Sequence, residues 1–194
     1  YETEWLIAQT KNDSDMFKYV VWLSVRVAET SNIMGMEKAF VYLAKNYYLS
    51  GKAWWVNPPV MKTYRQRVET LERILIGAIA PELRMWDTTK HVVSLHAVQA
   101  DYTVLVFWEY DCGHCKKEVP KWNKQYNELK KDYNINMIGI TTSSLKSKWT
   151  KFIYSKELSE WLHLYDPDYT SPFRQYYDIT STPKVFIIGK DKKI

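Results

Sequence analysis

The sequence predicts an α/β domain preceded by a small all-α domain. Apolar side chains follow a helical period in the first 76 residues, whereas apolar strands alternate with helices from about residue 77 onward. The only two cysteines form a Cys-x-x-Cys motif at 112–115, shortly after the apolar run 104–108. With 194 residues, 46% of them hydrophobic, the chain is long enough for two cores. We therefore expect a helical domain over 1–76 and an α/β domain over 77–194.

Three amphipathic helices are expected in the helical domain. The first begins at Asp13 or Ser14, because either side chain suits an N-cap. The second starts near Met36 and ends at Gly51, a residue that suits a left-handed C-terminal cap. The third follows the Asn-Pro-Pro segment 57–59, since proline fits the first helical turn. Each helix has one apolar stripe, so the three must pack together to bury it.

The α/β domain begins near residue 77, where helical periodicity gives way to alternation. The segment 103–108 is almost continuously apolar, as in a central strand covered on both faces. A helix that opens at the cysteine motif joins this strand to a second one at 136–142, which predicts a right-handed βαβ unit with parallel strands. The other expected elements are a strand at 93–95, a helix at 146–156, a strand at 161–165, a helical turn at 172–177 and a strand at 184–188.

Charge and hydropathy exclude two classes of function. The formal net charge is +5, but lysines and acidic residues are interspersed and form no basic stripe, so we expect no nucleic-acid partner. No apolar run approaches the ~18 residues needed to span a bilayer, so we expect no membrane span in this chain. The sequence starts at Tyr1 without a signal segment, and we expect any targeting segment to have been removed from it.

The cysteine motif predicts two thiols with different roles. Cys112 precedes a helix, whose free N–H groups and dipole stabilise a thiolate, so it is the expected nucleophile. Cys115 lies one turn further in and is the expected resolving thiol, more buried and protonated. A partly charged His114 imidazole would stabilise the Cys112 thiolate further and raise the reduction potential. The alternative is that His114 is an exposed residue with little electrostatic effect.

The Cys-x-x-Cys motif also occurs in three other kinds of site. A zinc site needs two further ligands at matching spacing, and His91, His96 and His163 are isolated from one another in the sequence. A binding module in which the two thiols hold a soft metal such as Cu(I), or act in scaffolding, stays open. A thioredoxin-fold peroxidase requires a Thr-x-x-Cys setting, but Glu109 stands three residues before Cys112. We expect no metal and no cofactor other than a redox-active disulfide between the two cysteines.

The segments 107–120, 80–83, 93–95 and 182–183 together resemble the thioredoxin superfamily, and most closely the TlpA/ResA-like thiol-disulfide oxidoreductases. The resemblance covers about residues 77–194. It implies a thioredoxin-like fold with a central mixed sheet flanked by helices, and a cis peptide bond at Pro183 beside the cysteines. It also implies that the backbone of Thr182 pairs with an extended substrate peptide.

The resemblance implies roles for two further residues, and the sequence differs from the family pattern at two positions. It implies that Trp108 packs beside the site and that Glu118 manages the proton of the resolving thiol. The alternative is that Glu118 is an exposed helix residue without a role in the reaction. Asp111 stands where many thioredoxins have tryptophan, and its charge opposes that of His114. Val106 stands where classical thioredoxins carry a buried aspartate. The direction of redox preference therefore stays open.

The resemblance also implies a biological setting. It suggests an enzyme that exchanges dithiol for disulfide with protein or peptide substrates, assisted by an unidentified redox partner protein, in the bacterial periplasm or cell envelope. The helical segment 1–76 resembles the extra N-terminal domain of some exported members of this family. A thioredoxin fold has one more strand and helix after the strand expected at 184–188, so we expect this chain to be shortened at its C-terminus.

Overall fold

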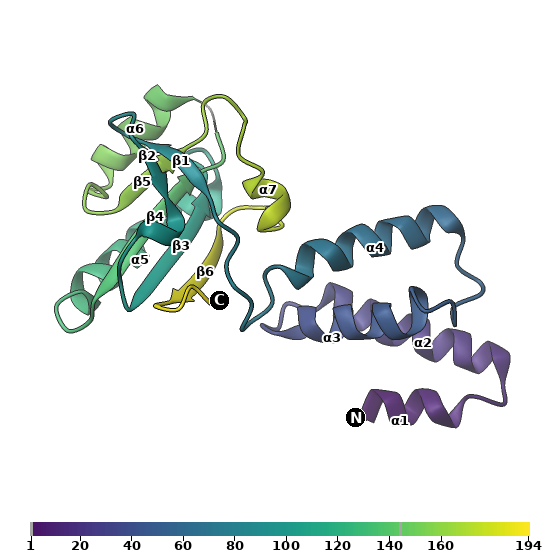
Figure 1. The fold of residues 1–194 in the computed structure, drawn as a ribbon. Coiled ribbons are helices and arrows are strands. Elements are labelled where there is room, and N and C mark those ends of the chain that lie inside the picture. Colours follow the sequence, from purple (N-terminus) through teal and green to yellow (C-terminus); the bar gives the residue numbers. More distant parts are fainter. Residues whose placement is uncertain (1, 144) are drawn as a thin grey trace. The chain divides into compact units, whose positions relative to one another are not determined.

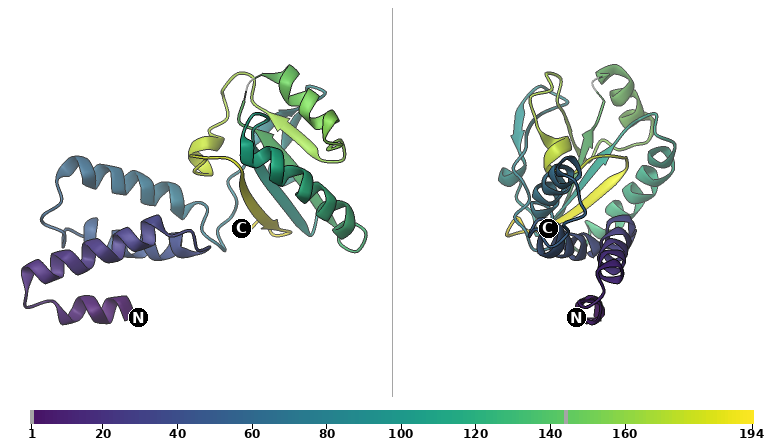
Figure 2. Two further views of the ribbon diagram at one scale, coloured as in Figure 1. Left: turned by 180° about the vertical axis from the view of Figure 1, so that it is seen from behind. Right: turned by 90° about the vertical axis from the view of Figure 1, so that its right-hand side faces the viewer.

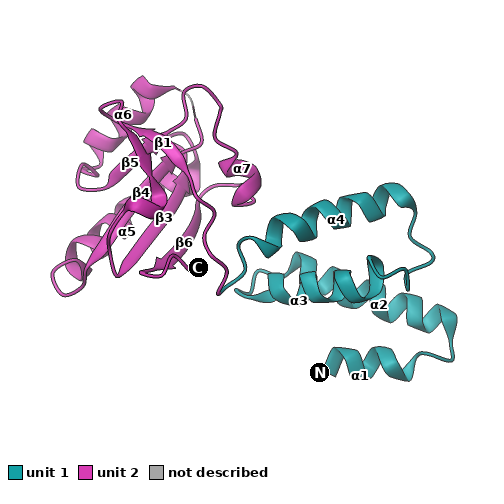
Figure 3. Ribbon diagram, in the orientation of Figure 1, with its two compact units in different colours: residues 1–76 teal, residues 77–194 magenta. Residues whose placement is uncertain are grey.

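The computed structural model describes residues 2–143 and 145–194. The chain divides into two units, Tyr1–Ile76 and Gly77–Ile194, shown in teal and magenta in Figure 3. Helices make up the first unit, and the second combines helices with a sheet (Figure 1).

The first unit is a bundle of helices with polar caps. Asp13 caps the second helix through its carboxylate, which accepts bonds from two backbone N–H groups. Asn57 caps the last helix by accepting from the N–H of Val60 at 3.0 Å. These caps satisfy N–H groups that a helix leaves without internal partners. The helices are α1 (Glu2–Gln9), α2 (Ser14–Thr30), α3 (Met36–Leu43), which continues as the π-helix η1 (Ala44–Tyr48), and α4 (Pro58–Glu72).

Two features of this unit differ from the sequence-based expectation. The helix α1 was not expected, because it is short and has one fully buried residue, Ile7, so it leaves no periodic apolar stripe in the sequence. The expected helix toward Gly51 is present, but its last part is a π-helix. Gly51 follows that segment with φ at +82°, a left-handed conformation that suits glycine.

The core of the first unit is aromatic and aliphatic. Val21 on α2 and Phe40 on α3 are fully enclosed, and Val68 on α4 meets them in the same cluster. The rings of Tyr48 and Tyr64 lie 4.7 Å apart between centroids. Each helix contributes one apolar stripe to this cluster, so the stability of each helix depends on packing against the others.

The second unit is built on a six-stranded mixed sheet with the strand order β2-β1-β5-β4-β3-β6. Strand β3 pairs in parallel with β4 and antiparallel with β6, so it is an interior strand. The connection from β3 through a helix to β4 is the expected βαβ unit, visible from two sides in Figure 2. The strands are β1 (Arg84–Asp87), β2 (Val92–Ser94), β3 (Tyr102–Trp108), β4 (Ile135–Thr141), β5 (Leu162–Tyr165) and β6 (Lys184–Gly189).

Both faces of the central strands are covered, which explains their apolar sequences. Val106 and Trp108 share a buried cluster with side chains of α5 (Gly113–Leu129) and α6 (Lys146–Ser155). On the opposite face, Phe107 stacks at 5.8 Å on Phe173 of α7 (Phe173–Tyr176). Side chains alternate along β3 between these two layers, as a strand requires.

The start of this unit departs from expectation. Strand β1 was not expected, because only Met85 among its four residues is buried and no alternation marks it. The sequence predicts a strand that includes Leu95, but Leu95 begins the 3-10 helix η2 (Leu95–Ala97). Ser94 caps this helix, and its side chain accepts a hydrogen bond from the N–H of Ala97. The serine hydroxyl therefore ends β2 one residue before Leu95.

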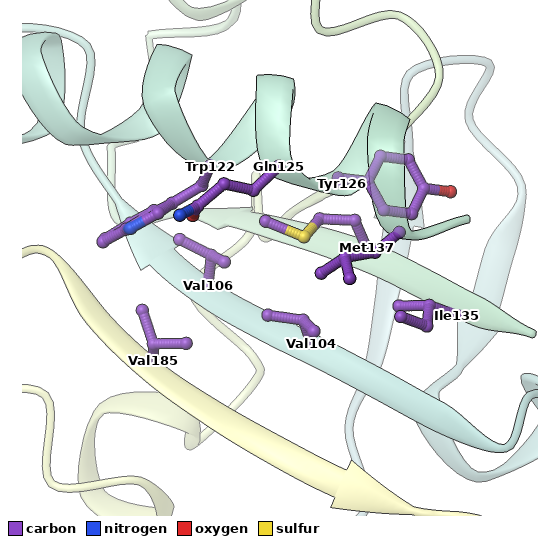
Figure 4. Close-up of a pocket in the computed structure, with 9 residues that line it drawn as sticks. Val104, Val106, Trp122, Gln125, Tyr126, Ile135, Met137 and Val185 are labelled. Atoms are coloured by element: carbon purple, nitrogen blue, oxygen red, sulfur yellow. The ribbon is translucent and has the colours of Figure 1, made fainter. Parts of the chain in front are cut away.

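Strand β6 forms an outer edge of the sheet. Val185 and Ile187 are 40% and 60% exposed on the face that α5 covers elsewhere. Beside them, an apolar groove of about 280 Å³ runs between α5 and the sheet, as Figure 4 shows. After β6 the chain turns, and Lys193 forms an antiparallel bridge with Ile79. The groove is lined by Val104, Val106, Trp122, Gln125, Tyr126, Leu129, Ile135, Met137 and Val185.

Candidate active site

The cysteine motif lies where β3 ends and α5 begins. Cys112 is the N-cap of α5, with extended backbone angles, and its Sγ accepts a bond from the N–H of Cys115 at 3.2 Å. Both cysteines are free thiols. Cys112 is partly exposed, whereas Cys115 is completely buried one turn into the helix. One thiol is thus open to a substrate and the other is shielded.

The loop before β6 lies against this motif. The Sγ of Cys112 donates to the backbone carbonyl oxygen of Thr182 at 3.3 Å. The peptide bond between Thr182 and Pro183 is cis. Register explains the meeting, because Phe107 near the end of β3 is paired with Lys184 at the start of β6. Because the end of β3 lies beside the start of β6, the loop that precedes β6 reaches the thiol of Cys112.

The two thiols are shifted in opposite directions. For Cys112, partial burial opposes ionisation most, but hydrogen bonds involving Cys115, the Thr182 side chain and the His114 backbone together lower its pKa below the ordinary value. Burial raises the pKa of Cys115 to about 11, and its hydrogen bond to Cys112 also raises it. The environment therefore favours a thiolate at the exposed sulfur and a thiol at the buried one.

The residues on either side of Cys112 occupy different environments. Asp111 and His114 are both exposed, and His114 lowers the Cys112 pKa through its backbone N–H. Trp108 is completely buried and belongs to the cluster that contains Cys115 and contacts Cys112. The tryptophan thus lies behind the motif, within the core on the α5 face.

Glu118 lies on α5 one turn beyond Cys115. Its carboxylate forms an ion pair with Lys121 at 2.8 Å, on the partly exposed side of the helix. A second carboxylate, Glu109, directly follows β3 and is half-buried. It accepts a bond from the hydroxyl of Thr142 at 3.1 Å, and its backbone forms a hydrogen bond with Cys115 that favours the thiolate. One carboxylate, that of Glu109, thus precedes Cys115 in the sequence, and another, that of Glu118, follows it.

An ion pair that the sequence did not reveal holds the Thr182 loop. The Nζ of Lys184 donates to the backbone carbonyl oxygen of Asp178 at 2.8 Å and lies 3.2 Å from its carboxylate. Asp178 is buried and has φ at +52°. Because Lys184 directly follows Pro183, this pair closes the loop 179–183 at its base. Two opposite charges six residues apart form no local sequence pattern that predicts this ion pair.

Two further findings concern the described part of the chain. Within residues 2–143 and 145–194, no group of three or more His, Cys, Asp or Glu side chains is placed to hold a metal ion. In the same residues, no helix combines the length and apolar character required to cross a membrane.

Comparisons with known proteins assign a family to the second unit. The sequence model of the AhpC/TSA family matches residues 76–194. A search of curated proteins found no match. Among solved structures, a domain from Cytophaga hutchinsonii described as a "possible thiol-disulfide isomerase" is 36% identical, with a TM-score of 0.59. That match covers 62% of this chain and 82% of the other.

Two other solved structures extend the comparison. The thioredoxin domain of a thiol-disulfide oxidoreductase from Bacteroides vulgatus is 26% identical with a TM-score of 0.57, and the match covers 62% of this chain and 86% of that one. A thioredoxin-like protein from Bacteroides caccae is 20% identical with a TM-score of 0.78; the match covers 98% of this chain and 69% of the other, and it concerns the fold alone. The family match spans more than half of the chain, so the chain belongs to the AhpC/TSA family and is a thioredoxin-like member related to thiol-disulfide oxidoreductases.

Proposed function

We propose that the chain exchanges dithiol for disulfide with protein or peptide substrates through Cys112 and Cys115. One observation carries this proposal: the Sγ of Cys112 is partly exposed and accepts the N–H of Cys115 at 3.2 Å, whereas Cys115 is buried. These environments lower the pKa of the exposed thiol and raise that of the buried one to about 11. A nucleophile and a resolving thiol need these properties. No cofactor other than the Cys112–Cys115 disulfide enters the proposal.

In the reducing direction the reaction has two steps. The Cys112 thiolate attacks one sulfur of a substrate disulfide, and the other substrate sulfur leaves as a thiolate that takes up a proton. Cys115 then loses its proton and attacks the Sγ of Cys112, which releases the second substrate sulfur. The enzyme ends with a disulfide between its cysteines, and two electrons have passed to the substrate. The oxidising direction reverses every step.

The Thr182 loop supplies the substrate-binding part of the proposal. An extended peptide that adds to the backbone at Thr182 is brought to the exposed Cys112, whose sulfur already lies 3.3 Å from the Thr182 carbonyl oxygen. Pro183 has no N–H and so adds no donor beside the sulfur. Main-chain pairing of this kind tolerates different side chains, which suits a protein that acts on more than one substrate.

Resolution requires a base for the proton of Cys115. We assign this task to Glu118, as the family resemblance implies, although its carboxylate is paired with Lys121 in the resting protein. Exchange of that ion pair for a water-mediated contact with the thiol would free the carboxylate during resolution. Trp108 packs behind both thiols in this proposal, and Asp111 and His114 modulate the ionisation of Cys112.

The proposed setting follows from relatives rather than from the site. We propose protein thiols and disulfides as substrates, a separate redox protein as electron partner, and the bacterial periplasm or cell envelope as location. The helical unit over 1–76 is proposed to be an accessory domain of the thioredoxin-like unit over 77–194.

The test compares the full chain with Cys112→Ser and Cys115→Ser in insulin reduction and in reactivation of a scrambled disulfide protein. We expect both variants to lose turnover, and Cys115→Ser to accumulate a mixed disulfide at Cys112 that the double variant does not form. Activity retained by both single variants overturns the proposal. Metal analysis of the reduced protein and a peroxide-consumption assay test the soft-metal and peroxidase alternatives; stoichiometric Cu(I) binding without exchange activity favours the first.

A further inference from the structure

His163 is a buried histidine that the exchange reaction does not use. It lies in β5 and is only 4% exposed. Its Nε2 lies 2.8 Å from the backbone carbonyl oxygen of Leu158. A carbonyl oxygen only accepts hydrogen bonds, so Nε2 carries the proton and Nδ1 has a free lone pair. Burial lowers the pKa of His163 to about 4, which keeps the ring neutral near pH 7.

Two indole donors accompany this acceptor. The Nε1 atoms of Trp108 and Trp149 and the Nδ1 of His163 are buried, and within the described residues none of the three has a hydrogen-bond partner. The centroid of the imidazole lies 6.2 Å from the Trp108 ring and 6.1 Å from the Trp149 ring. Buried polar groups are nearly always paired, and these three are chemically complementary because an indole only donates.

Gly139 explains how two of these atoms approach one another. Strand β4 lies between β3 and β5, and Gly139 is in register with Val106 on one side and His163 on the other. A Cβ at Gly139 would lie 2.8 Å from the Nε1 of Trp108 and 3.0 Å from the Nδ1 of His163. The donor and the acceptor therefore converge over the glycine, and a side chain there would displace them.

Trp108 connects this cluster to the thiols. It is the last residue of β3, and the backbone of the next residue, Glu109, forms a hydrogen bond with Cys115. Trp108 and Cys115 also share one buried cluster, against which Cys112 packs. A rotation of the indole would move the end of β3 and so the wall against which the resolving thiol lies.

We propose that His163 is a positioning residue for the exchange reaction: one buried water beside Gly139 accepts a hydrogen bond from the indole N–H of Trp108 and donates one to the Nδ1 of His163. This role rests on the proposed function, because it concerns the placement of Cys115. His163 touches no reacting atom, and it acts through Trp108.

The experiment measures the indole and the thiols separately in the ¹⁵N-labelled full chain. The variant His163→Phe removes the acceptor, His163→Gln retains one, and Gly139→Ala places a methyl group between the two nitrogens. Gly189→Ala is the matched control, because its Cβ would meet only the flexible Asp191 side chain at 3.1 Å and the Lys193 carbonyl oxygen at 3.8 Å. Readouts are the Trp108 indole N–H resonance and the equilibrium of the cysteine pair with glutathione.

We expect His163→Phe and Gly139→Ala to shift the indole resonance toward that of an unbonded N–H and to change the glutathione equilibrium roughly three- to tenfold. His163→Gln should restore much of both, and Gly189→Ala should change neither. An unchanged indole resonance in His163→Phe overturns the hydrogen bond, and a shifted resonance with an unchanged equilibrium overturns the positioning role.

One measurement on the unsubstituted protein needs no variant to fold. In its ¹⁵N spectrum, His163 should be neutral at pH 7 with its proton on Nε2 and with Nδ1 as an acceptor; a proton on Nδ1 contradicts the proposal. Failure of the proposed function would appear differently. The wild-type chain would then form no reversible Cys112–Cys115 disulfide, whereas its Trp108 indole resonance would still be that of a hydrogen-bonded N–H.

Discussion

The thiol of Cys112 donates a hydrogen bond to the backbone carbonyl oxygen of Thr182, 70 residues further along the chain and 3.3 Å away. The contact exists because the end of β3 and the start of β6 are paired, with Phe107 opposite Lys184. It joins the proposed nucleophile to the proposed peptide-binding loop. Changes in the loop are therefore expected to alter the chemistry of the thiol.

The side chain of Thr182 is the first target. Its hydrogen bond is one of the causes that lower the Cys112 pKa, so Thr182→Val should raise that pKa and leave less thiolate at a given pH. The pH profile of Cys112 alkylation by iodoacetamide should move to higher pH, whereas Thr182→Ser keeps the hydroxyl and should preserve the profile. A profile that is identical in the valine variant contradicts this role.

His114 offers a pair of variants that separate its backbone from its imidazole. His114→Ala removes the imidazole and keeps the N–H that helps to lower the Cys112 pKa, whereas His114→Pro removes both. Proline is tolerated in the first turn of a helix, so α5 should persist. We expect the proline variant to show the larger rise in the pH midpoint of alkylation and a lower reduction potential. Equal effects of both variants would assign the influence to the imidazole.

Glu118 is tested through resolution of the mixed disulfide. We expect Glu118→Gln to slow this step by about 10²-fold near pH 7, because the Cys115 thiol, with a pKa of about 11, then lacks its base. Stopped-flow measurement of substrate release across pH provides the readout. Lys121→Met is the control, because it removes the partner of the ion pair and keeps the carboxylate. Unaltered release in the glutamine variant at every pH speaks against the assignment.

The Lys184–Asp178 pair is expected to stabilise the loop and the unit that carries it. Lys184→Met removes a partly buried, charge-assisted contact and should lower the stability of this unit by about 1–2 kcal/mol. Protection of the buried Cys115 from alkylation in urea reports on this unit alone. The Lys184→Met substitution should also raise KM for a peptide disulfide more than it changes kcat.

A matched control for Lys184→Met is Lys190→Met. Lys190 pairs with Asp101 at 3.5 Å, and both side chains are well exposed. Loss of that pair should change stability by less than about 1 kcal/mol. Equal effects of the two substitutions would show that the loop contact has no special weight.

Much of the fold follows from local signals. The apolar run that became β3, the caps Asp13 and Asn57, and the cysteine N-cap of α5 each specify their element without distant contacts. Elements without such signals were missed. Helix α1 buries a single residue completely, and β1 has no alternation, so both depend on the neighbours against which they pack.

Local sequence places Cys112 at the start of a helix and Cys115 one turn further in, because their spacing and their position after a strand fix both. The surroundings of the two thiols, in contrast, depend on contacts between distant parts of the chain. His163, an isolated histidine in the sequence, lies beside Trp108, and Lys184 meets Asp178, because strand register brings distant residues together. Such contacts depend on which strands pair and in what register, and no local pattern records that.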